Sequence, residues 1–390
     1  MLTKASVTTP PPSPSLIFAG GGTGGHIYPA LAIAEHAARI NPAVRAHILC
    51  SSRAVDAKIL SAEQTPFTPL PAQPPVPRPG PMFRFVRAWP KSVRTARVVL
   101  AEHTLSGPTI LVAMGGFVCP PAVVAALKQG VPVALVNLDA VPGKANRWVA
   151  ERAEKTFTAA EVPQSEHNAW SVVGPIVRPA LTDPSEPAAA RERFGLAPDA
   201  PTLLITGGSL GAQSINLLLI KLLADHPDAF RGWQAIHQTG AQHDPAPLRA
   251  AYAKAGVRAW ADHYLGPADM PAAWAAADLS IGRCGAGTVA EAWATRTPAV
   301  FFPYPYHADQ HQKRNAQPLV RAGSAIVLDD LVEPEANAKA HAQTILALLT
   351  DHARFAALAE PAVRLHPADG AERVARALLD RLETGRFSDA

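Results

Sequence analysis

Short apolar runs alternate along the chain with glycine-rich turns and alanine-rich stretches. Near-continuous apolar runs of this kind are typical of strands buried on both faces of a parallel sheet. Because each run leads into a turn and then a helical stretch, the pattern predicts α/β architecture with two doubly wound, Rossmann-like domains. The predicted strands are 15–19, 44–50, 109–113, 131–136 and 155–159 in the first half, and 202–206, 233–239, 279–281, 299–302 and 325–327 in the second.

Prolines mark the boundary between the two halves. Pro175, Pro179, Pro184 and Pro187 punctuate a strand-poor stretch, so we expect a linker at roughly 175–186. The last stretch, 370–384, repeats apolar residues at helical spacing, and the sequence leaves open which domain that helix packs on. The expected organisation is a disordered tail at 1–14, an N-terminal domain at 15–178, a C-terminal domain at 179–366 and the closing helical segment at 367–390.

Composition narrows the class of protein. A chain of 390 residues suits two domains of about 150–200 residues each. The hydrophobic share of 48% excludes a disordered chain, and a net charge of +4 gives no reason to expect a nucleic-acid partner. Cys50, Cys119 and Cys284 are widely spaced and offer neither a disulfide framework nor a metal motif.

Two segments bear on membrane contact. Residues 107–127 carry no charge, but Gly115, Gly116, Pro120 and Pro121 interrupt them, so we expect a buried strand, a loop and a helix instead of a bilayer span. The amino terminus lacks the pattern of a signal peptide. From these features we expect a cytoplasmic protein without a transmembrane segment.

Residues 76–100 contain no acidic residue and interleave basic with apolar side chains. Such a mixture favours contact with an anionic membrane surface, because the basic groups attract lipid headgroups and the apolar ones insert. A basic helix with a core-facing apolar stripe explains the pattern equally well. The residues of this membrane patch are Phe83, Arg84, Phe85, Arg87, Trp89 and Lys91.

The first glycine-rich loop, 20–25, follows a predicted strand and precedes a helix expected at 30–40. Consecutive glycines allow the backbone to approach a ligand, and a helix N-terminus favours an anion. His26 stands at this junction, where open α/β sheets place their active sites. A plain glycine turn with a structural histidine is the simpler alternative.

Two further glycine loops follow strands in the second half. Residues 207–211 include Ser209 and suit a diphosphate, but lack the Lys-Ser/Thr of a P-loop. Residues 282–287 lead into a helix bearing Glu291, whose carboxylate is suited to two ribose hydroxyls. A polar loop at 303–316 offers amide, imidazole and carboxylate groups for a sugar. Each residue alone is more simply a solvated loop residue, but together the loops indicate a nucleotide-sugar site.

Taken together, these segments resemble the MurG family of UDP-N-acetylglucosamine transferases, which have the GT-B fold. The resemblance covers nearly the whole chain in order and spacing. It is carried by GGGTGGHIYPALAIAE (20–35), MGGFVCPPAVVAAL (114–127), DAVPGKANR (139–147), VVGPIVRPAL (172–181), TGGSLGAQSIN (206–216), IHQTG (236–240), DMPAAWAAADL (269–279), GRCGAGTVAEA (282–292), DQHQKRNA (309–316) and AERVARALLDRL (371–382).

The resemblance implies roles for individual residues. His26 and Thr23 are expected at the reaction centre, with His26 as the general base. Acceptor-side positions are Gly115, Gly116, Phe117 and Asn137. Residues expected to bind UDP-N-acetylglucosamine are Thr23, Gly24, Gly25, His26, Asp139, Arg178, Ser209, Ala286, Gly287, Thr288, Glu291 and Gln312.

The implied reaction is an inverting transfer to an undecaprenyl-diphosphate-linked N-acetylmuramoyl-pentapeptide, as used in peptidoglycan synthesis, at the cytoplasmic face of the plasma membrane. No cofactor or metal is expected, since the donor half lacks an Asp-x-Asp motif. The acceptor motifs depart from the family: Asn137 replaces a usual Glu, and Cys119 a small residue. Alternatives are therefore a UDP-sugar transferase with another lipid acceptor, or a silent nucleotide-sugar-binding relative.

Overall fold

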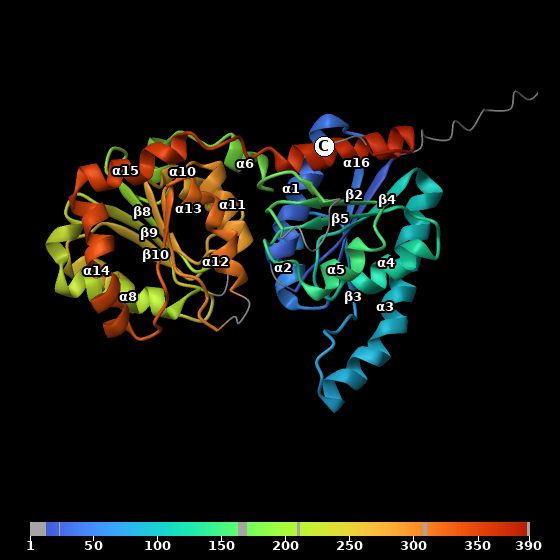
Figure 1. Cartoon of the computed structure of the whole chain (residues 1–390), viewed down its shortest axis with the longest axis horizontal. Helices are drawn as coiled ribbons and strands as arrows, with labels where there is room; N and C mark the ends of the chain where they lie inside the picture. Colours follow the sequence, from blue (N-terminus) through green and yellow to red (C-terminus); the bar gives the residue numbers. More distant parts are fainter. Residues whose placement is uncertain (1–12, 23, 163–169, 209–210, 307–309, 388–390) are drawn as a thin grey trace, which may run out of the picture.

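The computed structural model describes residues 13–22, 24–162, 170–208, 211–306 and 310–387. The expected tail at 1–14 lies almost wholly outside these residues. Within them the chain forms two parallel sheets, each flanked by helices on both faces (Figure 1). The predicted pair of doubly wound α/β domains is confirmed.

The N-terminal sheet has the strand order β3-β2-β1-β4-β5-β6-β7 and is parallel throughout. Every residue of β1 and β4 at its centre is buried, which explains the uninterrupted apolar runs. Its strands are β1 (Ser15–Ala19), β2 (Arg45–Ser51), β3 (Phe67–Leu70), β4 (Thr109–Ala113), β5 (Val133–Asn137), β6 (Lys155–Thr158) and β7 (Ser171–Val172).

The C-terminal sheet has six parallel strands in the order β10-β9-β8-β11-β12-β13. In both sheets the carboxyl ends of the strands lead into the glycine loops, so the loops gather at one edge. Its strands are β8 (Thr202–Thr206), β9 (Gln234–Gln238), β10 (Ala259–Asp262), β11 (Leu279–Gly282), β12 (Ala299–Phe301) and β13 (Ala325–Val327).

Helices cover both faces of each sheet and enclose apolar cores on either side. The N-terminal domain contains α1 (Gly24–Ile40), α2 (Ala54–Ala62), α3 (Pro79–Ser106), α4 (Cys119–Leu127) and α5 (Lys144–Ala150). The rest of the chain contributes α6 (Pro179–Thr182), α7 (Pro187–Arg193), α8 (Gln213–Asp225), a 3-10 turn (Pro227–Phe230), α9 (Ala246–Lys254), α10 (Asp269–Ala276), α11 (Ala286–Ala294), α12 (His311–Asn315), α13 (Gln317–Arg321), α14 (Pro334–Thr350), α15 (His352–Val363) and α16 (Gly370–Thr384).

Four local features differ from the sequence prediction. Strands β3, β7 and β10 were not anticipated; each is an edge strand with a single neighbour, β7 has two residues and β3 contains Pro69, so none has the apolar run of a central strand. Helix α1 begins at Gly24, so the predicted start at residue 30 is wrong. Glycine and an internal proline, Pro29, disfavour a helix locally, and burial of the first turns outweighs that preference.

The closing helix α16 crosses back and packs on α1 of the N-terminal domain (Figure 1). Its apolar face, including Val374 and Leu378, belongs to the same core as Leu16 and Phe18 of β1. A Cβ on Gly370 would lie 2.5 Å from the carbonyl oxygen of Gly174, so only glycine permits this crossing. The position that the sequence left open is therefore on the N-terminal domain.

Candidate functional site

A pocket lies between the two domains where both sheets present the carboxyl ends of their strands. Its walls come from the start of α1, the segment before α6, the ends of β8 and β9, the loop before α10 and the first turns of α11. Among the predicted site residues, Gly24, Gly25, Arg178, Gly287, Thr288 and Glu291 line this pocket. Thr23 and Ser209 lie outside the described residues.

Asp56, in the first turn of α2, holds the first glycine loop in place. Its Oδ2 accepts hydrogen bonds from the backbone N–H of Gly22 (2.7 Å), and from the N–H (2.9 Å) and hydroxyl (2.6 Å) of Ser51. Arg53 donates to the Gly22 carbonyl at 2.8 Å. A Cβ on Gly21 would lie 2.4 Å from Asp56 Oδ2, so this loop depends on glycine. Sequence reasoning did not identify Asp56.

His26 lies in the first turns of α1 and faces the Gly115–Gly116 loop after β4. A Cβ on Gly115 would lie 3.0 Å from His26 Nε2, and one on Gly116 would lie 3.3 Å from Cε1. Both glycines also have positive φ, at 113° and 79°. Burial lowers the pKa of His26 from its usual 6.5, although Asp139 opposes this shift. A neutral imidazole is the form that accepts a proton.

Other residues of the predicted acceptor-side loop contact the first glycine loop and the end of β1. Phe117 lies next to the first glycine loop, with its ring 3.0 Å from a Cβ built on Gly22. The Cys119 thiol is buried and donates toward the carbonyl oxygens of Ala19 (2.9 Å) and Gly115 (3.0 Å). Burial raises the pKa of this thiol to about 12, so it acts as a neutral loop anchor and not as a nucleophile.

Asn137 is fully buried, and its side chain is occupied by protein contacts. Its amide donates to the Asp139 carbonyl at 2.8 Å and to Thr158 Oγ1 at 3.0 Å, while its oxygen accepts from Asn146 Nδ2 at 2.9 Å. Asn137 thereby holds the loop that follows β5. In that loop, Asp139 Oδ1 accepts a 2.9 Å hydrogen bond from Asn315 of the C-terminal domain.

The end of the second glycine loop, at Gly211, packs against the residue that follows β9. A Cβ on Gly211 would lie 2.1 Å from the carbonyl oxygen of Thr239, which requires glycine there. Asn216 of α8 donates to that carbonyl at 3.0 Å, and its side-chain oxygen lies 3.0 Å from His237 Nε2. This network joins the start of α8 to β9, and Gly208, before the part of the loop that is not described, lines the pocket.

The third glycine loop places Ala286, Gly287 and Thr288 in the first turn of α11. Ala286 packs against the N-terminal core, so α11 begins at the boundary between the domains. One helical turn further, Glu291 faces the pocket and accepts a 3.0 Å hydrogen bond from the indole N–H of Trp274. Burial raises the pKa of Glu291 to about 7, and the Trp274 hydrogen bond opposes that shift.

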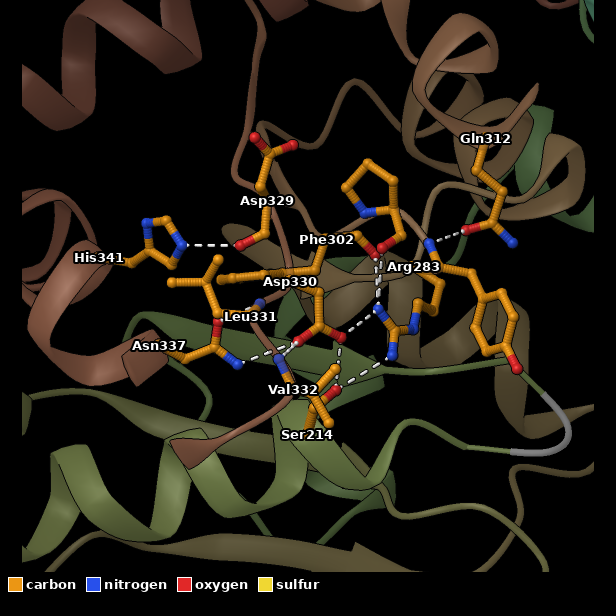
Figure 2. A network of polar contacts seen from close by, with 12 residues as sticks. Ser214, Arg283, Phe302, Gln312, Asp329, Asp330, Leu331, Val332, Asn337 and His341 are labelled. Carbon is orange, nitrogen blue, oxygen red and sulfur yellow. Dashed lines mark hydrogen bonds and ion pairs between the residues drawn. The ribbon is translucent and has the colours of Figure 1, made fainter. Parts of the chain in front are cut away.

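A buried ion pair joins Arg283 of the third glycine loop to Asp330, which follows β13. Arg283 Nη1 lies 2.6 Å from Asp330 Oδ2, and Ser214 of α8 donates to the same oxygen at 2.6 Å. Arg283 also donates to the carbonyl oxygens of Phe302 and Pro303, both at 3.1 Å, and Figure 2 shows Arg283, Asp330 and Ser214 together in this network. The pair therefore connects α8, β11 and the end of β12.

Gln312 stands at the far side of this network (Figure 2). Its side-chain oxygen accepts a 2.9 Å hydrogen bond from the backbone N–H of Tyr304, whose ring lies 5.7 Å from the Arg283 guanidinium carbon. Gln312, His26, Ala286 and Asp139 are not among the residues lining the pocket. His26, Ala286 and Gln312 lie in the first turns of α1, α11 and α12, and Asp139 lies in the loop after β5.

Arg178, at the end of the predicted N-terminal domain, is engaged by two carboxylates. Its guanidinium donates to Glu63 at 2.6 and 3.0 Å and to Glu35 at 2.5 Å. Both glutamates belong to the N-terminal domain. Arg178 thus lines the pocket while held on its N-terminal side.

Sequence reasoning missed two tyrosines that meet across the pocket. The hydroxyls of Tyr28 in α1 and Tyr264 after β10 lie 2.7 Å apart, and both side chains line the pocket. Tyr28 was visible inside the first motif, but nothing local in the sequence pairs it with a residue 236 positions away.

Comparison with known proteins gives consistent matches over most of the chain. The glycosyltransferase family 28 N-terminal domain matches residues 16–158, and the family 28 C-terminal domain matches 202–367. A Nocardioides protein named UDP-N-acetylglucosamine--N-acetylmuramyl-(pentapeptide) pyrophosphoryl-undecaprenol N-acetylglucosamine transferase is 35% identical, covering 94% of this chain and 97% of its own. A protein of the same name from Acidothermus cellulolyticus is 36% identical, covering 92% and 96%.

Solved structures share the fold. The crystal structure of Acinetobacter baumannii MurG has a TM-score of 0.65 at 24% identity, covering 94% of this chain and 99% of its own. The UDP-GlcNAc 2-epimerase from Neisseria meningitidis bound to UDP-GlcNAc has a TM-score of 0.59 at 11% identity, covering 94% and 100%. With two facing parallel-sheet domains, family 28 matches in both and relatives aligned nearly end to end, this chain belongs to the MurG family of family 28 glycosyltransferases.

Proposed function

We propose that this protein transfers N-acetylglucosamine from UDP-N-acetylglucosamine to the 4-hydroxyl of undecaprenyl-diphospho-N-acetylmuramoyl-pentapeptide, a step of peptidoglycan synthesis. The observation that carries the proposal is the pocket between the domains, which combines the starts of α1 and α11 with the Glu291 carboxylate. Two helix N-termini suit a diphosphate, and a buried carboxylate suits ribose hydroxyls. The relatives' shared name specifies the same donor and acceptor.

The donor is proposed to bind mainly to the C-terminal domain. Glu291 receives the ribose hydroxyls, and the uracil lies against the wall formed by Leu265, Gly266 and Met270. The diphosphate meets backbone N–H groups at the second and third loops, with Ser209, Ala286, Gly287 and Thr288 as the contributing residues. Gln312 is assigned to the sugar, and Arg178 to the nucleotide once it leaves Glu35 and Glu63.

His26 is proposed as the general base. It takes the proton from the acceptor 4-hydroxyl as that oxygen attacks the anomeric carbon, and the bond to the UDP oxygen breaks on the opposite face. The anomeric configuration is thereby inverted. The lowered pKa of His26 supports this role because the imidazole is neutral at physiological pH. The leaving UDP is stabilised by the helix N-termini, so the proposal assigns no step to a metal ion or cofactor.

Helix α3 is proposed to contact the cytoplasmic face of the plasma membrane. From Pro79 to Lys91 none of its residues is buried, and Phe83 and Val86 are 61% and 58% exposed. In Figure 1 this half of α3 extends away from the N-terminal sheet. The exposed apolar side chains favour the membrane interpretation over a core-facing stripe. Among the described residues, no helix has both the length and the apolar character needed to cross a bilayer.

An alternative assignment exists for the acceptor. Asn137 is buried within a hydrogen-bond network and offers no base, so the acceptor side differs from that of the family pattern. A different lipid acceptor fits this departure, whereas a silent binding protein does not fit the grouping of His26 with the glycine loops.

UDP release separates these functions. Purified protein is supplied with UDP-N-acetylglucosamine and either no acceptor, a lipid I analogue or diacylglycerol in detergent. The proposal predicts UDP release only with the lipid I analogue. Release only with diacylglycerol would select the other-acceptor function, and no release under any condition, with UDP binding retained, would select the silent relative.

A further inference from the structure

The side chain that hydrogen-bonds to Glu291 belongs to a different helix from Glu291 itself. Trp274 belongs to α10 and Glu291 to α11, and the indole Nε1–H donates to Glu291 Oε2 at 3.0 Å. Trp274 is only 1% exposed and packs in the core beneath the pocket, outside its lining. The indole therefore contacts Glu291 from behind and leaves its pocket face to a ligand.

Burial of Trp274 restricts the conformations that are open to the carboxylate. An indole has a single N–H donor, and when buried it normally has a partner, here Glu291 Oε2. A carboxylate fixed through one oxygen keeps the other, and the remaining lone pairs, directed into the pocket. Fixing the orientation before the ligand binds avoids part of the entropic cost of ordering the side chain.

The same helix also shapes the neighbouring wall. Met270, in the first turn of α10, lines the pocket together with Gly266 of the preceding loop, and Trp274 follows Met270 by about one helical turn. Part of the wall proposed for the uracil and the donor that orients the carboxylate thus belong to the same helix.

We propose that Trp274 is a positioning residue that orients Glu291 for the two ribose hydroxyls and thereby sets selectivity for ribose over deoxyribose. The inference rests on the proposed function, in that it takes Glu291 as the ribose-binding group. Its consequence is confined to ligands that carry a 2′-hydroxyl. Loss of the indole N–H weakens UDP binding far more than 2′-deoxy-UDP binding.

The test is calorimetric titration of wild type, Trp274→Phe and Glu291→Gln with UDP and with 2′-deoxy-UDP. Phenylalanine fills most of the indole site and removes the donor. The wild type is expected to prefer UDP by about tenfold, the scale of one hydrogen bond to a charged group. Trp274→Phe is expected to reduce that preference at least threefold, with the affinity for 2′-deoxy-UDP changed less than twofold.

Trp293→Phe is the matched control, since Trp293 lies in the same helix as Glu291 and its indole donates to the His366 carbonyl at 2.8 Å. It loses the same kind of hydrogen bond away from the pocket and should keep the wild-type preference. Equal losses for both nucleotides in Trp274→Phe would show a merely structural role and overturn the inference. If Glu291→Gln keeps the wild-type preference, the ribose assignment itself fails, which is a separate outcome.

Discussion

The phenolic oxygens of Tyr28 and Tyr264 lie 2.7 Å apart and join the two domains across the pocket. Tyr28 comes from the helix that carries His26, and Tyr264 from the loop that leads to α10. Both side chains are partly buried, so the hydrogen bond is partly shielded from water. This contact ties the helix bearing the proposed base to the wall of the proposed donor site.

A double-mutant cycle measures this link. Tyr28→Phe and Tyr264→Phe each remove one partner, and each should lower the free energy of unfolding by about 1 kcal/mol. Because both changes remove the same hydrogen bond, the double variant should cost little more than either single one. Chemical denaturation of the four proteins gives the coupling energy. Strictly additive losses would mean that the hydroxyls do not interact.

The buried ion pair between Arg283 and Asp330 should dominate the local stability. Asp330→Asn leaves Arg283 buried without its counter-charge and should cost about 3 kcal/mol in the free energy of unfolding. Burial alone would raise the pKa of Asp330, but hydrogen bonds from Ser214 and Asn337, with Arg283, hold it below its usual value. The carboxylate is therefore charged at neutral pH.

The adjacent residue provides the control for that substitution. Asp329 is 73% exposed and pairs with Lys313 at 3.2 Å, so Asp329→Asn should cost less than about 1 kcal/mol. Denaturation curves of the two variants can be compared directly. Similar losses of unfolding free energy at positions 329 and 330 would show that the buried pair stabilises the protein no more than the exposed pair does.

The two titrating groups should separate in the pH dependence of activity. Protonation of Glu291, whose pKa is raised to about 7, removes acceptors for the ribose hydroxyls, so KM for the donor should rise as pH falls through about 7. The pKa of His26 is lowered from 6.5, so kcat should fall only at still lower pH. Steady-state kinetics between pH 5 and 8 measure the pH dependence of both KM and kcat.

Two variants assign each of these pH dependences to a residue. Glu291→Gln should abolish the rise of KM near pH 7, and His26→Ala should reduce kcat by about 100-fold or more while UDP affinity stays near the wild-type value. Near-normal turnover in His26→Ala would remove His26 from the role of base. A KM profile unchanged in Glu291→Gln would assign that titration to another group.

Membrane contact by α3 should depend on its basic residues. Changing Arg84, Arg87 and Lys91 to Glu should weaken co-sedimentation with phosphatidylglycerol vesicles by at least tenfold, since each basic residue near an anionic surface contributes about 1 kcal/mol. The same charge change at the exposed Lys254, Arg258 and Lys339 of the C-terminal domain is the control. Equal binding by both triple variants would contradict the proposed patch.

Local patterns predicted most of the fold. The central strands and glycine loops are found where apolar runs and glycines place them, since a strand buried on both faces must be apolar along its length. The edge strands β3 and β10 lack that signal. The start of α1 at Gly24 was missed because glycine and Pro29 disfavour a helix until tertiary contacts bury its first turns.

The supporting contacts of the site could not be predicted in the same way. Asp56 lies outside the motif that it holds, and Asp330 pairs with Arg283 from 47 residues away. From the sequence alone, Trp274 is indistinguishable from an ordinary core residue, because its hydrogen bond to Glu291 is visible only in the structure. Only the packing of separate elements brings such pairs together, and no local spacing encodes it.

The most direct measurement of the proposed function is the structure of the product. The protein is incubated with UDP-N-acetylglucosamine and a lipid I analogue, and the product is isolated and examined by NMR. We expect one N-acetylglucosamine joined to the muramoyl 4-oxygen with a β-anomeric linkage, opposite to the α-linkage of the donor. An α-linkage, attachment at another oxygen, or no product from an enzyme that binds UDP would contradict it.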